Sequence, residues 1–258
     1  MNLGSSLIYG PVSSWRLGRS LGIDLLPPTS KTCSFDCTYC QLGRTTKPLV
    51  ERREFVSTDK VTAALKQVRG VVADYATFSG MGEPTLASNL GPAIWTARRI
   101  LQLPIAVLTN SSLMAREDVR QELALADMVV AKLDAPNEAL FRLINRPVPG
   151  LTFSDVTEGL RRFAKEYRGR LALQVMFVQA NKDYAAEIAR IAKELWPDEV
   201  QINTPLRPCP VAPLSPDEIA TIRQEFVGFR NVVTVYEAKR PSITPLNLKE
   251  TLRRRPTL

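Results

Sequence analysis

The chain has 258 residues, of which 45% are hydrophobic and 23% charged, a balance typical of a globular protein that buries one large core. Lys and Arg number 34 against 26 Asp and Glu, which gives a net charge of +8, and histidine is absent. The absence of imidazole excludes Ser/His and Cys/His catalytic pairs and His-ligated zinc. The apolar stretches are short and the amino-terminal MNLGSSLIYG does not resemble a signal peptide, so we expect a cytoplasmic protein without a membrane span.

Short β-rich runs alternate with longer amphipathic segments, the pattern of repeated βα units around a parallel sheet. Strands are predicted at residues 20–26, 75–79, 105–109, 128–133, 171–178, 200–204 and 232–236. Helices are predicted at residues 59–68, 94–101, 117–125, 138–144, 153–167 and 184–195, and another begins at a capping box formed by Ser215 and Glu218. Six or so βα units predict an α/β fold, either a TIM-type barrel or an open, partial barrel.

The sequence shows no composition break that divides the chain into two large domains. We expect residues 1–240 to form the barrel with an amino-terminal extension, and residues 241–258 to form a carboxy-terminal tail. The tail sequence LKETLRRRPTL is helical and basic in character. It fits the start of a further, truncated small module, and it fits a frayed basic terminus equally.

Three of the four cysteines, Cys33, Cys37 and Cys40, lie within CSFDCTYC, directly after the first predicted strand. The loops after parallel strands meet at one face of a barrel, where chemistry is usually located. A [4Fe–4S] cubane normally takes four cysteines, so three thiolates indicate a cluster with one iron left open. A zinc site is the alternative, with Cys209, an aspartate such as Asp36 or another oxygen donor as the fourth ligand.

The spacing Cys-x₃-Cys-x₂-Cys, with Tyr39 before the last cysteine, resembles the signature of the radical S-adenosylmethionine (SAM) superfamily. The stretch Met81-Gly82-Glu83-Pro84 resembles the Gly-Gly-Glu-Pro stretch of that family, with methionine in place of the first glycine. YGPVSSWRLGRSLGIDLLP, QLGRTT and INRP look like a subgroup near the wyosine-type tRNA-modifying enzymes, many of whose members have no assigned substrate. Ser13 and Trp15 stand where proline and arginine are expected in that subgroup.

This resemblance implies a partial (βα)₆ barrel of the radical SAM kind and a [4Fe–4S] cluster held by the three cysteines. It also implies that the open iron chelates the amino and carboxylate groups of SAM. One electron then splits the sulfonium and gives a 5′-deoxyadenosyl radical that abstracts hydrogen from a substrate. The implied protein is an enzyme of the oxidoreductase or transferase class, with an electron donor such as a ferredoxin or flavodoxin as its partner.

Four residues in or near these motifs are SAM-site candidates by the same resemblance. Glu83 is expected to accept hydrogen bonds from the methionyl ammonium, or else to be a surface acid, and Gly82 permits close backbone approach. Tyr39 is expected to pack in the site while its backbone meets the adenine. Lys132 shares a strand face with Asp134, so it either binds the SAM carboxylate or pairs with that aspartate.

Neutral amides at strand ends suit ribose hydroxyls or adenine edges, or they are ordinary turn residues. The candidates of this kind are Asn110, Gln174 and Asn203. Cys209, in RPCP after the sixth predicted strand, is either a small buried cysteine or a catalytic residue that donates a hydrogen atom to a substrate radical or forms an adduct with it.

The substrate stays open among RNA, a peptide and a small metabolite. The net charge of +8 favours an anionic partner, although a solvated basic surface explains it as well. The rival function is a non-catalytic nucleic-acid-binding protein that carries zinc or a cluster.

Overall fold

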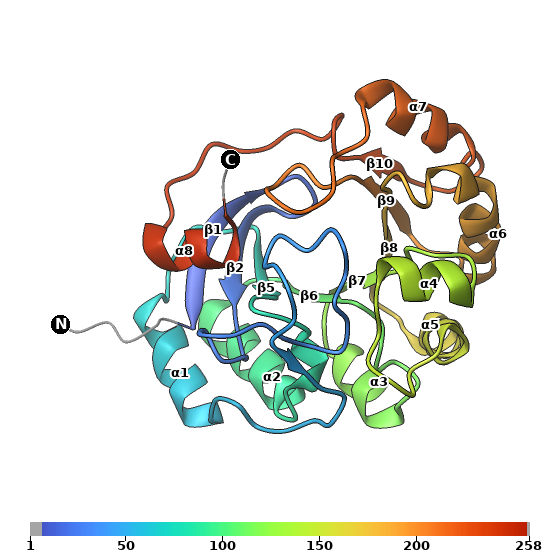
Figure 1. Cartoon of the computed structure of the whole chain (residues 1–258). Helices are drawn as coiled ribbons and strands as arrows, with labels where there is room; N and C mark the ends of the chain where they lie inside the picture. The colour runs from blue at the N-terminus through green and yellow to red at the C-terminus, as the bar shows by residue number, and fades with distance from the viewer. Residues whose placement is uncertain (1–6, 257–258) are drawn as a thin grey trace.

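A single curved sheet forms the frame of the computed structural model, which describes residues 7–256 (Figure 1). Its eight strands lie in the order β1-β2-β5-β6-β7-β8-β9-β10, and only β1 is antiparallel to its neighbour. The strands are β1 (Ile8–Ser14), β2 (Gly18–Ile23), β5 (Tyr75–Phe78), β6 (Ile105–Thr109), β7 (Met128–Lys132), β8 (Arg170–Met176), β9 (Glu199–Asn203) and β10 (Val232–Thr234). This near-sequential order is that of an open half-barrel, which confirms the expected partial barrel.

Helices surround the outer side of the curved sheet, and the long loop after β2 lies in front of its inner side (Figure 1). The helices are α1 (Thr58–Gln67), α2 (Leu90–Leu101), α3 (Glu117–Leu123), α4 (Glu138–Ile144), α5 (Phe153–Glu166), α6 (Ala185–Leu195), α7 (Pro216–Gln224) and α8 (Leu248–Arg254). Short 3₁₀ turns are η1 (Pro84–Leu86) and η2 (Lys182–Tyr184), and β3 (Thr32–Cys33) pairs with β4 (Lys47–Pro48) inside the long loop. Among residues 7–256, no helix is both long and apolar enough to cross a membrane.

The seven predicted strands are all present, with small shifts at their ends. The capping box predicted at the start of α7 is confirmed, since Ser215 Oγ accepts from Glu218 N and Glu218 accepts from Ser215 N. Helix α2 begins at Leu90 rather than at residue 94. Its Pro92 sits in the first turn, where a missing N–H costs little because it has no partner within the helix.

Strand β1 was not predicted. Gly10 and Pro11 interrupt the alternation of its sequence IYGPVSS, and a proline lacks the N–H that an inner strand needs. The strand tolerates them because it lies at the sheet edge, where β2 is its one neighbouring strand in the sheet, with a register shift between Tyr9 and Val12.

The inner face of the half-barrel changes from apolar to polar along the strands. Alternate residues near the strand starts form a small apolar cluster closed by the β1–β2 turn, made of Leu17, Ala106, Met128, Val130 and Ala172. Farther along the same strands, Lys132 of β7 lies beside Gln174 of β8, and Met176 lies beside Asn203 of β9. The apolar floor therefore gives way to a polar zone at the carboxyl ends of the strands.

After β10 the chain crosses to the opposite sheet edge, where α8 packs against β1 (Figure 1). Thr251 Oγ1 accepts from Gly10 N at 3.0 Å, and Leu246 N donates to Gly10 O at 2.7 Å. The tail segment thus spans the two ends of the half-barrel. The division of the chain at residue 240 stays a prediction.

Candidate active site

A cavity of about 460 Å³ opens at the carboxyl ends of the parallel strands. It gathers ten of the eleven site residues predicted from the sequence, namely Cys33, Cys37, Tyr39, Cys40, Gly82, Glu83, Asn110, Lys132, Gln174 and Asn203. The exception is Cys209. The loops that follow β2, β5, β6 and β9 therefore meet at one site, as expected for a barrel of parallel strands.

The cysteine loop, residues 31–45, is held in shape by its own polar groups. Asp36 Oδ1 accepts from Thr45 N at 2.7 Å, and Asp36 Oδ2 pairs with Arg44 Nε at 2.7 Å. Lys31, which is 4% exposed, donates to Gly43 O at 2.9 Å. A turn joins two of the cysteines, since Cys40 N donates to Cys37 O at 3.1 Å. Asp36 serves this loop and does not line the cavity.

The loop is also attached to the segment after α4. Thr38 N donates to Ile144 O at 2.9 Å, and Asp36 N to Asn145 O at 3.0 Å. The rings of Phe35 and Phe141 meet edge to face, with centroids 5.2 Å apart. The INRP sequence that the resemblance singled out, residues 144–147, therefore forms part of the support for the cysteine loop.

Gly82 lies against the cysteine loop in a conformation that only glycine fits. Its φ is +154°, and a Cβ at this position would meet Thr32 O at 1.6 Å. Two backbone hydrogen bonds join β3 to the stretch after β5, from Thr32 N to Met81 O at 2.9 Å and from Glu83 N to Thr32 O at 3.1 Å. The close approach predicted for Gly82 is thus made to the protein's own backbone beside Cys33.

Glu83 is 2% exposed, so it is not a surface acid. Its Oε1 accepts from Thr85 N, Thr85 Oγ1 and Thr109 Oγ1 at 3.1, 2.7 and 2.7 Å, and its Oε2 accepts from Asn110 N at 2.6 Å. Burial raises the pKa of Glu83, and these hydrogen bonds oppose that shift. Oε1 is saturated, whereas Oε2 has capacity for a further donor.

Asn110 supports the cysteine loop. Its Nδ2 donates to Ser34 Oγ at 2.9 Å and lies 3.5 Å from Cys33 Sγ, and its Oδ1 accepts from Ser112 N at 2.9 Å. A second amide acts similarly, because Asn145 Nδ2 lies 3.6 Å from Cys37 Sγ. Hydrogen bonds to the sulfurs tune metal-bound thiolates, so both amides belong to the surroundings of the cysteines.

Asp134 joins the strand ends to the cysteine loop. Its carboxylate accepts from Tyr39 O–H, from Asn145 Nδ2 at 2.8 Å and from Met176 N at 2.8 Å. Lys132 Nζ lies 3.5 Å from Asp134 Oδ1 and 4.7 Å from the centroid of the Tyr39 ring. The neighbour pair of Lys132 and Asp134 is therefore present. Sequence reasoning gave Asp134 and Asn145 no role in holding Tyr39.

Of the remaining predicted residues, two line the cavity and one lies outside its lining. Gln174 is 5% exposed and Asn203 is 6% exposed, and both line the cavity on adjacent strands. Cys209 does not line the cavity, and its thiol donates to Val211 O at 3.2 Å. Its catalytic role stays a prediction.

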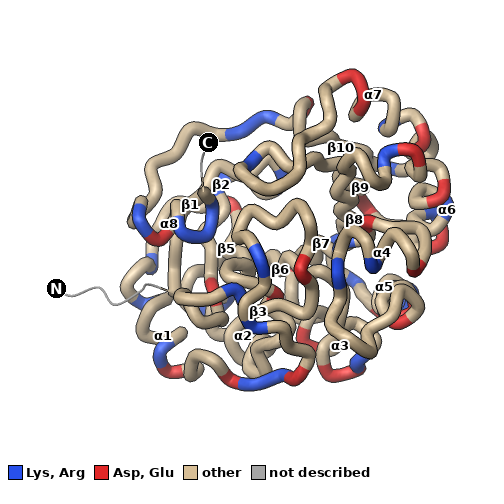
Figure 2. The backbone as a smooth tube through the Cα atoms, in the orientation of Figure 1, with Lys and Arg blue, Asp and Glu red and all other residues tan. Residues whose placement is uncertain are grey.

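Sequence reasoning missed four arginines that line the cavity: Arg16, Arg207, Arg240 and Arg255. They come from the β1–β2 turn, the loop after β9, the segment after β10 and the end of α8. In Figure 2, Lys and Arg mark the segment between β10 and α8 and both ends of α8. Of these four, only Arg255 belongs to a noticeable sequence feature, the basic run Arg253-Arg254-Arg255.

The three thiols fit an iron–sulfur cluster in their chemistry. Burial raises the pKa of Cys33 to about 12 and that of Cys37 to about 11, so both would be neutral without a positive partner. Bound iron would supply that charge, and the neighbouring amides donate toward the sulfurs. In the part of the chain that the structure describes, no three Cys, Asp or Glu side chains surround a single-ion position. In a cubane each thiolate binds a different iron, so three thiolates would hold three irons and leave the fourth open.

Comparison with known proteins gives matches in sequence and in fold. The sequence model of the Radical SAM superfamily matches residues 28–194. The UPF0026 protein MJ1312 of Methanocaldococcus jannaschii is 37% identical over 235 residues, which cover 88% of this chain and 72% of that protein.

Two solved structures share the fold at low identity. TYW1 with a lysine-pyruvate adduct bound aligns with a TM-score of 0.62 at 16% identity, over 81% of this chain and 72% of that one. Native anSMEcpe with bound AdoMet aligns with a TM-score of 0.61 at 19% identity, over 84% of this chain and 64% of that one.

Proposed function

Because this chain belongs to the radical SAM superfamily, we propose that it is an enzyme that binds a [4Fe–4S] cluster through Cys33, Cys37 and Cys40 and uses SAM as its second cofactor. Once bound, these cofactors supply a 5′-deoxyadenosyl radical that abstracts hydrogen from a substrate. The observation that carries the proposal is the meeting of three cysteines and the Gly82-Glu83 stretch at one cavity. The oxidoreductase or transferase class depends on the substrate.

The residues around the cysteines hold them and provide places for SAM. Glu83 Oε2 has room for one more donor, which suits the methionyl ammonium of SAM. Lys132 faces the same cavity, and its ammonium suits the SAM carboxylate while Asp134 orients it. Gln174 and Asn203 present neutral amides suited to ribose or adenine.

The cavity walls protect a radical from side reactions. The apolar side chains of Leu108, Val130 and Met176 line its inner face, and the β1–β2 turn and the tail enclose it from the other side. Excluding water and stray hydrogen donors is the main protein contribution in cofactor-driven chemistry of this kind. A cytoplasmic location, in a reducing compartment with a ferredoxin or flavodoxin as electron donor, belongs to the same proposal.

The test is anaerobic reconstitution with iron and sulfide, followed by incubation with SAM and dithionite. We expect brown protein with broad absorption near 400 nm, roughly four iron atoms per chain, and formation of 5′-deoxyadenosine. Colourless protein that carries about one zinc would favour the nucleic-acid-binding alternative instead. Protein that holds the cluster and forms no 5′-deoxyadenosine would refute the SAM chemistry.

A further inference from the structure

The arginine wall, which we define as Arg16, Arg207, Arg240 and Arg255, brings four cations to one side of the cavity. The four residues come from segments far apart in the chain. Within residues 7–256, none of the four forms an ion pair with a carboxylate. Glu83, the one carboxylate among the residues that line the cavity, is already bound by Thr85, Thr109 and Asn110.

Arg16 carries a donor that no described residue satisfies. Its guanidinium carbon lies 4.5 Å from the centroid of the Trp15 ring, so one face of the group is covered. Its Nε is buried and has no hydrogen-bond partner among residues 7–256. Arg207 Nη1 donates to Pro256 O at 3.0 Å, a neutral acceptor. A buried charged donor without a partner is costly, and a ligand that accepts from it recovers that cost.

The four groups also repel one another. Burial lowers the pKa of Arg16, and the charges of Arg255, Arg207 and Arg240 lower it further, while the charge of Glu199 opposes the shift. The pKa of Arg207 is lowered by burial first and then by Arg255 and Arg240. Like charges gathered in a cavity favour a multiply charged anion, because one ligand then neutralises several of them.

We propose that the arginine wall binds a phosphate group of the substrate, which is therefore a phosphorylated small molecule; this rests on the enzyme function proposed above. Guanidinium forks match phosphate oxygens in pairs, and a phosphate monoester carries nearly two charges where a carboxylate carries one. A cavity of about 460 Å³ is in the size range of small-molecule sites. Single-stranded nucleic acid would need a longer basic groove with stacking aromatic side chains.

The wall and the cysteines come to one cavity from different segments of the chain. The cysteines and Lys132 approach the cavity from the loop after β2 and from β7, whereas the arginines approach from the β1–β2 turn, the loops after β9 and β10, and the tail. The two sets meet at the tail, where Gln41 Nε2, next to Cys40, donates to Arg254 O at 2.8 Å. A substrate held by its phosphate at the wall would therefore lie in the same cavity as the cysteines.

The experiment is anaerobic calorimetric titration of the reconstituted full chain with inorganic phosphate and with pyrophosphate, in the presence of saturating SAM. We expect saturable binding that Arg16→Gln and Arg207→Gln each weaken at least about tenfold. Arg16→Lys keeps the charge and loses the fork, so it should bind with intermediate affinity. The matched control is Arg190→Gln, which removes one charge from an α6 side chain that is 71% exposed, and it should bind as the unaltered chain does.

Several outcomes would overturn the inference. They are no saturable binding, equal weakening in Arg190→Gln, phosphate displaced by SAM, or a short single-stranded RNA that binds more tightly than pyrophosphate. Thermal melting of each variant shows whether weaker phosphate binding comes from unfolding. If Arg16→Gln does not fold, the phosphate affinity of Arg16→Lys is the deciding measurement. Phosphate binding needs no turnover. Protein that forms 5′-deoxyadenosine and takes up no phosphate therefore refutes this inference alone, and the reverse result refutes the proposed chemistry alone.

Discussion

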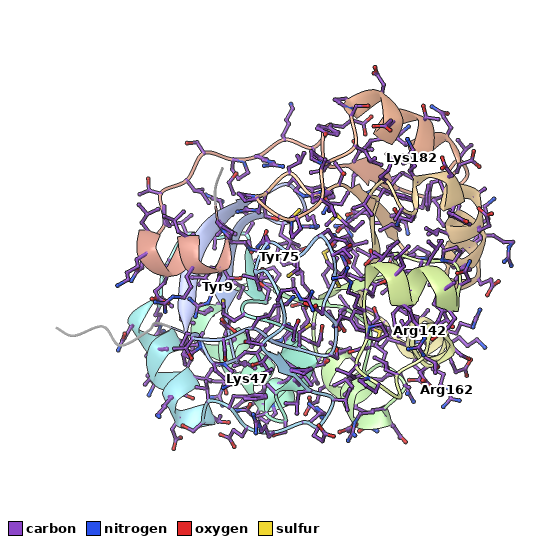
Figure 3. The ribbon with its side chains drawn as sticks, viewed as in Figure 1. Tyr9, Lys47, Tyr75, Arg142, Arg162 and Lys182 are labelled. Atoms are coloured by element: carbon purple, nitrogen blue, oxygen red, sulfur yellow. The ribbon has the colours of Figure 1, made fainter. Side chains whose placement is uncertain are left out.

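Arg254 Nε lies 2.6 Å from Asp24 Oδ2, and the two side chains are 0% and 1% exposed. The pair joins α8 to the segment just after β2. Asp24 also accepts from Leu26 N at 3.1 Å and Met81 N at 3.2 Å, so the same carboxylate contacts the segment before the cysteine loop and the stretch after β5 that bonds to that loop. The guanidinium lies 5.1 Å from the centroid of the Tyr9 ring, which Figure 3 labels beside α8, and it also pairs with Glu250 at 2.7 Å.

Arg254→Leu should lower the free energy of unfolding by about 3–5 kcal/mol, because it leaves the Asp24 carboxylate buried without its cation. Urea denaturation of the purified chain measures this. Arg253→Ala is the control, since Arg253 is 33% exposed and its pair with Glu250 should contribute only about 0–1 kcal/mol. The double variant Arg254→Leu with Asp24→Asn should recover part of the loss. Equal stability of Arg254→Leu and Arg253→Ala would show that the pair does not hold the tail.

Replacing any one of Cys33, Cys37 and Cys40 by Ala should abolish the absorption near 400 nm and the formation of 5′-deoxyadenosine, because the remaining two thiolates cannot hold a stable cubane. Cys209→Ala is the matched control and should retain roughly four iron atoms per chain, since Cys209 lies outside the cavity lining. If Cys209 is catalytic, product formation stops in that variant while 5′-deoxyadenosine is still made. Iron lost from Cys209→Ala would instead make Cys209 a ligand.

Glu83→Gln should weaken SAM binding by about tenfold or more while the cluster stays in place, because the amide keeps the shape and removes the charge offered to the ammonium. Equilibrium dialysis of SAM against reconstituted protein measures the affinity. Glu158→Gln, which removes an exposed carboxylate paired with Arg162 on α5, is the control and should leave SAM affinity unchanged. Unaltered binding in Glu83→Gln would limit Glu83 to its structural contacts with Thr85 and Thr109.

The pair of Lys182 and Glu218 should give the stability a defined pH dependence. Lys182, labelled beside α7 in Figure 3, lies with its Nζ 2.8 Å from Glu218 Oε1. The hydrogen bond from Lys182 Nζ is the largest cause, and the one from Ser215 N the second, that lowers the pKa of Glu218 to about 2. A carboxyl group whose pKa is lowered on folding stabilises the fold at pH values above its ordinary pKa of 4.5. This contribution is lost as the pH falls toward about 2.

The measurement is the melting temperature of the unaltered chain and of Glu218→Gln across that pH range. The difference should be largest near neutral pH and vanish near pH 2. In a Lys182→Ala background the difference should shrink. A difference that is constant with pH would assign the effect to the helix cap alone.

The sequence was sufficient to predict features that depend on residues close together in the chain. The apolar runs predicted the parallel strands, and the thiol spacing with the Gly82-Glu83 stretch placed the candidate site at their carboxyl ends. Lys132, Gln174 and Asn203 were found because a strand alternates its faces and its end opens on the cavity. These predictions depend on neighbours within a few residues.

The features that were missed depend on segments brought together by folding. Strand β1 carries a Gly-Pro break that only an edge position tolerates, and the sheet order is not visible in the sequence. The arginine wall combines residues from four distant segments, and each of them alone resembles an ordinary surface cation. Asn145 reaches Cys37 across more than a hundred positions, so its role follows from the α4 segment packing on the cysteine loop.

The return of α8 to β1 sets an order of assembly. Cys33, Cys37 and Cys40 leave the ribosome long before Arg255, so a nascent chain can present its thiols while one flank of the half-barrel is still uncovered. Iron delivery at that stage meets an accessible site. In the finished fold Arg255 and Pro256 line the same cavity as the cysteines, so the site takes its final form only when α8 has packed on β1.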